Sequence, residues 1–275
     1  KTLNISENLV YAGGCALNSL ANKRIFESKI FKKIFIPYAP GDAGGSIGSA
    51  SYYLKSKKVN LSNLKTPFIG PNYTNDQVEK IIFGKYNLKN NKVELLTDKN
   101  KLNNKIANLL YENKIIGYFN GKMEFGPRAL GNRSILANPC GEKIKDLINM
   151  KIKRRENFRP FAPAILEEEK DKWFNNNSSN YYMSSVELIN ENKKKLIPAV
   201  THIDGTGRVQ TVSKQLSLNF YNLIETFNKI SGVPILLNTS FNENEPIVNE
   251  PSQAIDCFLR THMDALVIEN YLITR

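Results

Sequence analysis

Arginine is scarce in this sequence and is grouped, whereas lysine is scattered through Asn-rich stretches. The arginines between Met123 and Pro163 are Arg128, Arg133, Arg154, Arg155 and Arg159. A planar guanidinium binds phosphate or carboxylate through paired N–H donors, while dispersed lysine is typical of a solvated surface. The segment therefore predicts a binding site for anions.

Two parts of this segment can present cations in different ways. Residues 121–134 mix glycines and arginines with Glu124, which is typical of a loop that presents side chains; a structural turn with surface arginines is an equal alternative. Residues 153–160 place cations between a predicted helix and strand. In an extended chain Lys153 and Arg155 lie on one face and can bind one phosphate, although such cations also complement a helix C-terminus.

Polar residues also gather in two later segments. Residues 201–210 place His202, Asp204 and Arg208 around a turn, where a hydrogen-bonded structural histidine is the main alternative to acid–base chemistry. Residues 238–242 follow an apolar strand, so their amides and hydroxyls are predicted to contact phosphate or ribose, with turn capping as the alternative. The sequence contains no Walker, Gly-x-Gly-x-x-Gly, Cys-x-x-Cys or Gly-x-Ser-x-Gly motif, so these patterns predict phosphate binding but specify no reaction.

Composition limits the class of protein. The chain has 275 residues, 41% of them hydrophobic, which is enough for one large or two modest well-packed domains. A net charge of +12 favours anionic partners. Its cysteines, Cys15, Cys140 and Cys257, are odd in number and far apart, which favours a reducing compartment over disulfides. With no apolar run of about 20 residues and no signal peptide, we expect a soluble, cytoplasmic protein without membrane partners.

Alternating strands and helices must position these groups, and they predict an α/β fold. In the first region strands are expected at 9–12 and 34–38, each followed by glycines and a helix. Residues 56–101 show weak periodicity, which predicts a domain boundary. In the second region helices are expected at 101–113, 142–153, 218–230 and 254–261, and strands at 115–119, 161–166, 233–237 and 265–268. The helix at 218–230 repeats apolar residues on one face: Phe220, Leu223, Ile224, Phe227 and Ile230.

Six blocks of sequence, in the right order over nearly the whole chain, closely resemble the O-carbamoyltransferase family that includes nodulation, cephem and tobramycin carbamoyltransferases. The blocks are Gly13–Asn18, Pro40–Asp42, Met123–Ser134, Lys153–Pro163, His202–Thr206 and Leu237–Asn242. The resemblance implies a partial actin/sugar-kinase-like transfer domain at 1–85, a linker at 86–100, and a YrdC-like α/β domain with a twisted mixed sheet at 101–275.

The resemblance also implies a reaction. The YrdC-like domain would join carbamoyl phosphate and ATP, with Mg²⁺, into carbamoyladenylate, and the transfer domain would pass the carbamoyl group to a hydroxyl of a small acceptor. Lys153, Arg155, Arg208 and Ser240 would be catalytic. The residues implied to bind substrate or ATP are Arg128, Arg133, Arg159, His202, Asp204, Asn238, Asn242, Gly13, Gly14 and Asn18.

The metal site implied by the resemblance is incomplete in this chain. Asp42 matches an aspartate that binds iron (Fe²⁺) in the transfer domain, but the family also uses two histidines with helical spacing, well upstream of anything present here. The histidines here are His202 and His262, both in the second region. We therefore expect the missing part of the transfer domain in the same polypeptide or on a separate chain.

Two other functions stay open at this stage. One is YrdC-type synthesis of threonylcarbamoyl adenylate for tRNA modification, against which the Met123–Arg128 block argues. The other is a basic RNA-binding module, which requires exposed aromatic residues among the cations, whereas most aromatics here fall in core-like strands and helices. Nucleic acid is therefore an unlikely partner, and the sequence does not identify the acceptor.

Overall fold

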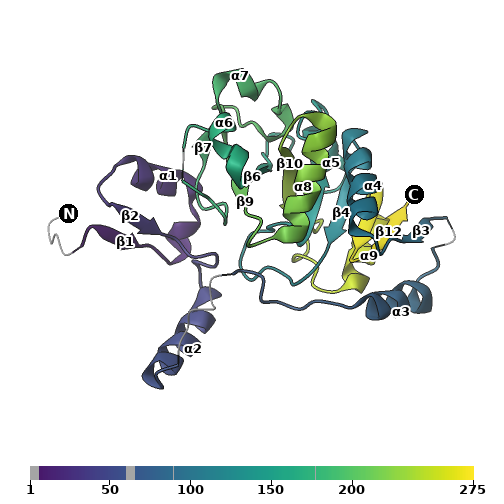
Figure 1. Ribbon diagram of the computed structural model, residues 1–275, viewed down its shortest axis with the longest axis horizontal. Helices are drawn as coiled ribbons and strands as arrows, with labels where there is room; N and C mark the ends of the chain where they lie inside the picture. Colours follow the sequence, from purple (N-terminus) through teal and green to yellow (C-terminus); the bar gives the residue numbers. More distant parts are fainter. Residues whose placement is uncertain (1–5, 60–65, 89, 177) are drawn as a thin grey trace.

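A computed structural model describes residues 6–59, 66–88, 90–176 and 178–275 (Figure 1). The helices are α1 (Ser19–Glu27), α2 (Gly44–Ser56), α3 (Asn75–Lys85), α4 (Lys99–Tyr111), α5 (Ile144–Lys151), α6 (Lys170–Trp173), α7 (Glu191–Lys194), α8 (Leu218–Ser231) and α9 (Pro251–Arg260). Short 3₁₀ turns occupy Gly14–Leu17, Glu167–Glu169 and Pro198–Val200. The strands are β1 (Asn8–Val10), β2 (Lys33–Phe35), β3 (Lys92–Leu95), β4 (Ile116–Phe119), β5 (Arg133–Ala137), β6 (Ala162–Leu166), β7 (Glu187–Leu188), β8 (Thr206–Gly207), β9 (Gln210–Val212), β10 (Ile235–Ser240), β11 (Ala265–Ile268) and β12 (Tyr271–Thr274).

An eight-stranded mixed sheet forms the centre of the molecule, in the order β3-β12-β11-β4-β5-β10-β6-β9. The pairs β4–β11 and β6–β9 are parallel, and the other neighbours are antiparallel. Strands β4, β5, β6 and β11 are buried along their whole length, as expected for a sheet covered on both faces. The predicted α/β fold with a mixed sheet is confirmed; its likeness to a YrdC-like domain stays a prediction.

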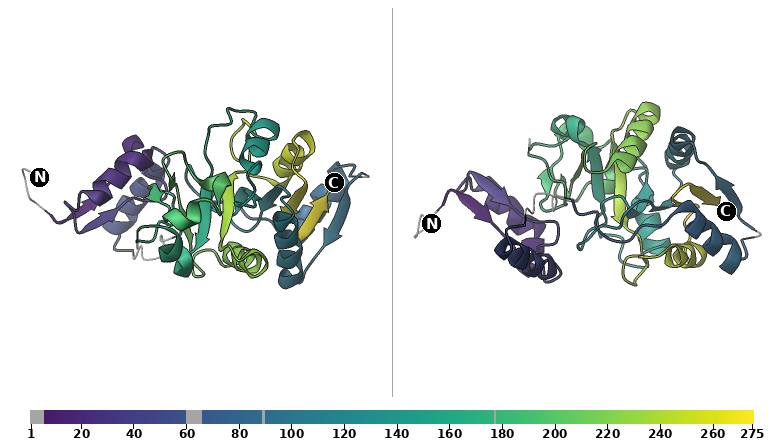
Figure 2. Two further views of the ribbon diagram at one scale, coloured as in Figure 1. Left: turned by 90° about the horizontal axis from the view of Figure 1, so that it is seen from above. Right: turned by 60° about the horizontal axis from the view of Figure 1, so that its bottom comes forward.

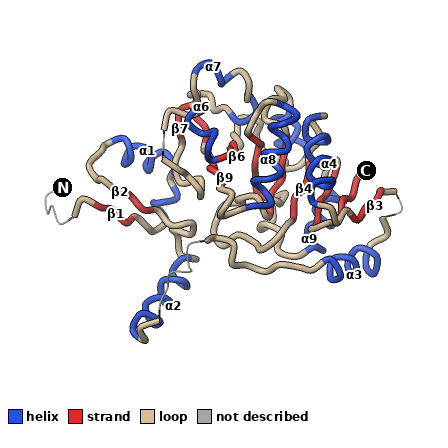
Figure 3. Tube along the Cα trace, in the orientation of Figure 1, coloured by secondary structure: helices blue, strands red, loops and turns tan. Residues whose placement is uncertain are grey.

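Helices cover both faces of this sheet (Figures 2 and 3). Helices α4 and α8 pack together on one face, and α5 and α9 lie on the other. On α8 the predicted apolar face is confirmed, since Phe220, Leu223, Ile224 and Phe227 are fully buried and Ile230 packs at the edge of the core. The helix ends at Gly232, whose φ of 72° is the left-handed conformation that glycine adopts without strain.

Residues 6–59 form a small unit at one end of the molecule (Figure 1). Strands β1 and β2 pair in parallel, and α2 extends away without burying any residue. Contact with the larger part runs through Asn22, whose Nδ2 donates to the Ser184 carbonyl at 2.7 Å, and through the edge-on rings of Tyr38 and Tyr182. Its assignment to an actin/sugar-kinase-like domain stays a prediction. Among the described residues, no helix is long and apolar enough to cross a membrane.

Residues 86–100 do not form the expected linker. Strand β3 lies within this range and pairs with β12 at the edge of the main sheet, and α3 before it places Val78 and Ile82 in the core. A start signal for α3 was present in the sequence, because Thr74 and Gln77 form a capping box. Polar composition hid both elements, since β3 is an edge strand with exposed lysine and α3 buries only one narrow face.

Candidate functional site

A cavity of about 730 Å³ lies at one end of β10. Its wall comes from the start of α1, the loop before β5, the segment between α5 and β6, and the turn before β8. Polar residues in the wall are Ser19, Arg128, Lys145, Arg155, Arg159, Thr201, His202, Asp204, Arg208, Asn238, Thr239 and Ser240. The cavity therefore brings together side chains from all the segments in which the sequence predicted anion binding, from Arg128 to Ser240.

The arginines of the cavity have few acidic partners. Arg159 pairs with Glu156 at 2.8 Å on the rim, but within the described part of the chain no carboxylate lies within 4.0 Å of the guanidinium of Arg128, Arg155 or Arg208. Among the described residues, the buried Nε of Arg208 has no hydrogen-bond partner. Buried donors without partners are rare in folded proteins and point to a ligand that supplies the acceptors.

Electrostatic repulsion accompanies this arrangement. Burial, together with the nearby charges of Arg128 and Arg155, lowers the pKa of Arg208 to about 10. Burial likewise lowers the pKa of Arg128 and of Arg155, where Arg159 adds to the effect. Like charges brought together in a partly buried site favour binding of a polyanion, because each new contact also relieves repulsion.

A buried carboxylate shapes the loop that carries Arg128. One oxygen of Glu124 accepts hydrogen bonds from the backbone N–H groups of Leu130 (2.7 Å), Asn132 (2.7 Å) and Arg133 (3.2 Å). Burial raises the pKa of Glu124, while these N–H donors favour its ionised form. The loop is thus fixed by its own backbone. Arg128 faces the cavity, and the one hydrogen bond that its side chain makes to a described residue is long, 3.4 Å to the Leu17 carbonyl.

Arg133 was predicted to bind substrate, but it lies inside the fold and not in the cavity wall. Its side chain has no exposed surface and lies beneath the loop, with its Cζ 3.5 Å from the centroid of the Phe119 ring. Its Nη atoms donate to the carbonyls of Gly121, Asn132 and Pro71 at 2.8–3.0 Å. Its Nε has no partner among the described residues, but its Nη donors are used inside the fold, so Arg133 holds the loop together and does not line the cavity.

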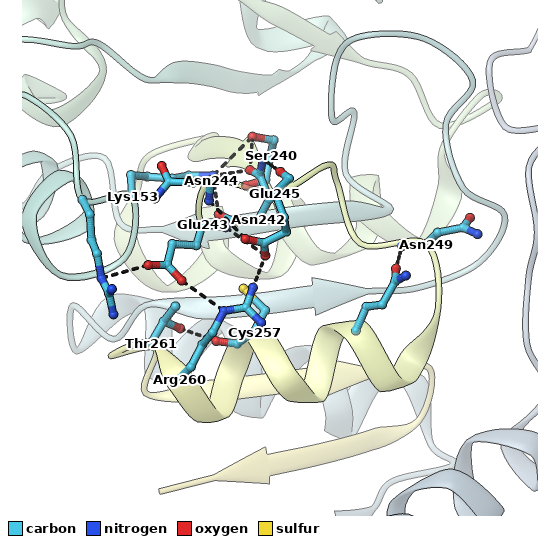
Figure 4. A network of polar contacts seen from close by, with 12 residues as sticks. Lys153, Ser240, Asn242, Glu243, Asn244, Glu245, Asn249, Cys257, Arg260 and Thr261 are labelled. Carbon is cyan, nitrogen blue, oxygen red and sulfur yellow. Dashed lines mark hydrogen bonds and ion pairs between the residues drawn. The ribbon is translucent and has the colours of Figure 1, made fainter.

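Lys153 does not bind beside Arg155 as predicted, because the chain between them is not extended. Arg154 adopts φ 43°, and this left-handed residue sends Lys153 inward while Arg155 lines the cavity. The Lys153 Nζ donates to the carbonyls of Ser240 (2.5 Å) and Asn242 (2.7 Å) and to Asn242 Oδ1 (2.7 Å), and it lies 3.2 Å from Ser240 Oγ (Figure 4). Lys153, Ser240 and Asn242 do meet, but Lys153 fixes the end of β10 and does not face the cavity.

Asn149, which the sequence patterns did not single out, organises the segment between α5 and β6. It is fully buried on α5; its Nδ2 donates to the carbonyls of Asn157 (3.3 Å) and Arg159 (3.0 Å), and its Oδ1 accepts from Arg155 Nε at 2.7 Å. One side chain therefore shapes the backbone that carries Arg159 and also orients the Arg155 guanidinium. A polar residue beside the apolar positions Ile144 and Ile148 was the signal available in the sequence.

We expect Asn149→Ala to weaken anion binding about tenfold and to lower the free energy of unfolding by about 2 kcal/mol, because a buried three-bond network is lost. Titration with inorganic phosphate followed by calorimetry, together with urea unfolding, measures both. The matched control is Asn138→Ala, a buried asparagine that donates to Asn113 Oδ1 at 3.0 Å and does not line the cavity. It should lower stability and leave phosphate affinity unchanged; equal losses of affinity in both variants would contradict the role of Asn149.

The residues predicted in the small N-terminal unit do not join the cavity. Gly13 and Gly14 are exposed, and Asn18 caps α1 by accepting from the N–H groups of Leu20 and Ala21 at 3.1 Å. Asp42 is exposed as well. Throughout 6–59, 66–88, 90–176 and 178–275, no group of three or more His, Cys, Asp or Glu residues could hold a metal ion. The residues described here therefore do not fit the implied iron site.

Comparison with known proteins agrees with the sequence blocks. The family profile described as Carbamoyltransferase C-terminus matches residues 107–275, and the one described as Carbamoyltransferase N-terminus matches residues 1–51. The chain is 40% identical to nodulation protein NolNO of Sinorhizobium fredii over 98% of its own length and 40% of that protein. It is 37% identical to nodulation protein NolO of Bradyrhizobium diazoefficiens over 97% of its own length and 49% of that protein.

Similar matches extend beyond the nodulation proteins. An uncharacterized protein of Synechocystis sp. is 36% identical over 98% of this chain and 48% of that protein. The crystal structure of full-length HypF in the phosphate- and nucleotide-bound form aligns with a TM-score of 0.43 and 17% identity, over 66% of this chain and 22% of that one. The chain spans about half the length of the curated relatives it matches or less. On the extent of the family profiles, the chain belongs to the carbamoyltransferase family.

Proposed function

We propose that this chain activates a carbamoyl group with ATP in the arginine-lined cavity, as part of an enzyme that transfers the group to a hydroxyl of a small molecule. The observation that carries the proposal is the set of cavity arginines without carboxylate partners, above all Arg208 with its unpartnered buried Nε. Carbamoyl phosphate and ATP are both polyanions, and their condensation requires several fixed cations in a confined site.

The proposed reaction has two parts at this cavity. Water converts carbamoyl phosphate into carbamate and phosphate, with cleavage of the bond between the carbamoyl carbon and the bridging oxygen. An oxygen of carbamate then bonds to the α-phosphorus of ATP, which enters with Mg²⁺, and pyrophosphate leaves as the bond between the α- and β-phosphoryl groups breaks. Arg128, Arg155 and Arg208 would hold the phosphoryl oxygens, with Arg159 at the rim.

The end of β10 supplies groups that suit the carbamoyl moiety. Asn238 is buried, and its Nδ2 donates to the carbonyl of Ala129 and to Gln210 Oε1, while its Oδ1 has no partner among the residues that the structure describes. An unpartnered acceptor in the cavity wall suits the amino group of a carbamoyl substrate. Ser240 would contribute its hydroxyl, held in place by the bond from its Oγ to Asn242 Oδ1 at 2.7 Å.

The second half of the reaction would need more than the residues described here. A hydroxyl oxygen of the acceptor would attack the carbamoyl carbon, and AMP would leave. The chain matches 48% and 40% of the length of two relatives. We therefore place the remainder of the transfer domain, in the same polypeptide or on a separate one, at the small N-terminal unit that contains Gly13, Gly14, Asn18 and Asp42.

Release of pyrophosphate tests the proposal. With carbamoyl phosphate, ATP and Mg²⁺ the chain should form pyrophosphate, detected by a coupled assay, at least about 100-fold faster than without carbamoyl phosphate, because only a bound carbamate can displace it. Lys229→Gln, which removes an exposed cation paired with Glu225 on α8, is the control for charge and should match the unmodified chain. If pyrophosphate forms only with bicarbonate and threonine, the product would be threonylcarbamoyl adenylate instead. If folded protein forms no pyrophosphate with either mixture, carbamoyl activation by this chain is rejected.

A further inference from the structure

The turn before β8 contains a linked set of polar side chains at the cavity wall. Its backbone is closed by two hydrogen bonds, from the His202 N–H to the Thr206 carbonyl (2.8 Å) and from the Gly205 N–H to the His202 carbonyl (2.9 Å). Gly205 has φ 76°, which favours glycine at this position. The turn is anchored by the pairing of β8 with β7, so His202 and Asp204 are held on a rigid element where they line the cavity.

The direction of the hydrogen bonds in this set fixes the tautomer of His202. Thr206 Oγ1 lies 2.7 Å from Asp204 Oδ1 and 3.1 Å from His202 Nδ1. The hydroxyl bond and the Thr206 N–H hold the pKa of Asp204 below its ordinary value, so the carboxylate only accepts. Thr206 must therefore give its single hydroxyl proton to Asp204, and its oxygen can only accept a proton from His202 Nδ1.

The other ring nitrogen is then free to act. With the proton on Nδ1, the lone pair lies on Nε2, and no hydrogen bond from another described residue uses it. The charged groups around the ring keep it neutral: burial lowers the pKa of His202, Arg208 and Lys145 lower it further, and Asp204 opposes them. Lys194 on α7 lies beside Gly205 in the same turn, where its ammonium pairs with Glu191 at 2.5 Å.

We infer that His202 is the general base of carbamoyl activation, held in its Nδ1–H tautomer by Thr206 and Asp204. The inference rests on the proposed function. Nε2 takes a proton from water as the water oxygen bonds to the carbamoyl carbon, the bond from that carbon to the bridging oxygen breaks, and phosphate leaves with the electron pair. The carbamic acid so formed loses its remaining acidic proton to solvent and becomes carbamate. Arg208 and Arg155 hold the departing phosphate, while Thr206 and Asp204 are positioning residues.

The tautomer can be measured without any activity. The chain has only two histidines, His202 and His262, so a long-range ¹H–¹⁵N spectrum of the imidazole rings contains two spin systems, and His262→Gln assigns them. At neutral pH His202 should show a protonated Nδ1 and an unprotonated Nε2. Thr206→Val keeps the shape of the side chain but removes the hydroxyl, and should mix the two tautomers. An Nε2–H ring or an imidazolium in the unmodified chain overturns the inference.

Kinetics separates this inference from the function on which it rests. His202→Gln should slow phosphate release from carbamoyl phosphate about 100-fold and remove the fall in rate at acidic pH, since that fall reports protonation of the base. Thr206→Val should reduce kcat about tenfold with little change in KM, and exposed His262→Gln should match the unmodified chain. An unchanged rate and pH profile in His202→Gln would overturn only the role of His202. An unmodified chain that forms no pyrophosphate would reject the proposed function and, with it, this role of His202.

Discussion

Replacement of Arg208 by glutamine should reduce pyrophosphate formation about 1,000-fold and leave the folded chain as stable as before or more stable by about 1 kcal/mol. The two effects have one cause. Arg208 has no acidic partner in the described fold, its Nε is unpartnered, and Arg128 and Arg155 repel it. Its positive charge costs stability in the unliganded chain and is matched only when an anion occupies the cavity.

Arg159→Gln is the matched comparison, because this arginine lies in the same cluster but is half exposed and paired with Glu156. It should reduce the rate only about fivefold, in keeping with the small net effect of exposed ion pairs. Arg208→Lys should restore part of the activity, since the charge returns without the planar pair of donors. Steady-state rates and urea unfolding measure both properties. A large loss of stability in Arg208→Gln would mean that the arginine supports the fold and not a ligand.

The sequence predicted most of the buried strands and helices but missed β5 in the centre of the sheet and β3 at its edge. Strands such as β4, β6 and β11 are continuous apolar runs, and α8 repeats its apolar residues with helical spacing, so local pattern and burial agree. Strand β5 was hidden because it begins with Arg133 and Ser134, polar residues that the sheet buries through tertiary contacts. A pattern within one segment does not report bonds made to residues elsewhere in the chain.

The same limit explains the outcome for the candidate site. Grouping of arginines identified Arg128, Arg155 and Arg159, which all reach the cavity. It did not separate them from Arg133, whose Nη donors are used inside the fold. Lys145 was missed because one lysine on a helix resembles any surface lysine. Spacing predicts which side chains are near one another along the chain; the fold decides which of them face a ligand.

Replacement of Lys153 by methionine should lower the free energy of unfolding by about 4 kcal/mol at neutral pH. Methionine fills nearly the same volume but donates no hydrogen bond, so the carbonyls of Ser240 and Asn242 lose their buried donor. The change should also weaken the packing of the segment after β10. Glu243 in that segment pairs with Arg154 and with Arg260 of α9, so the loss should reach α9 as well (Figure 4). Lys151→Met, at the exposed end of α5, is the matched control and should change stability by less than about 0.5 kcal/mol.

The cost of Lys153→Met should also depend on pH, and the sign follows from the proton count. Burial lowers the pKa of Lys153 to about 7, with a smaller contribution from Arg155, whereas the unfolded chain keeps the ordinary value of 10.5. Above pH 7 the unfolded state therefore holds more protons than the folded state, and the contribution of the lysine to stability rises with pH by up to about 1.4 kcal/mol per unit. The difference in unfolding free energy between the unmodified chain and Lys153→Met should grow from about pH 7 to about pH 9 in urea titrations. A difference that stays constant over this range would show that the surrounding oxygens, not burial, dominate the pKa, because the lysine would then be protonated in both states.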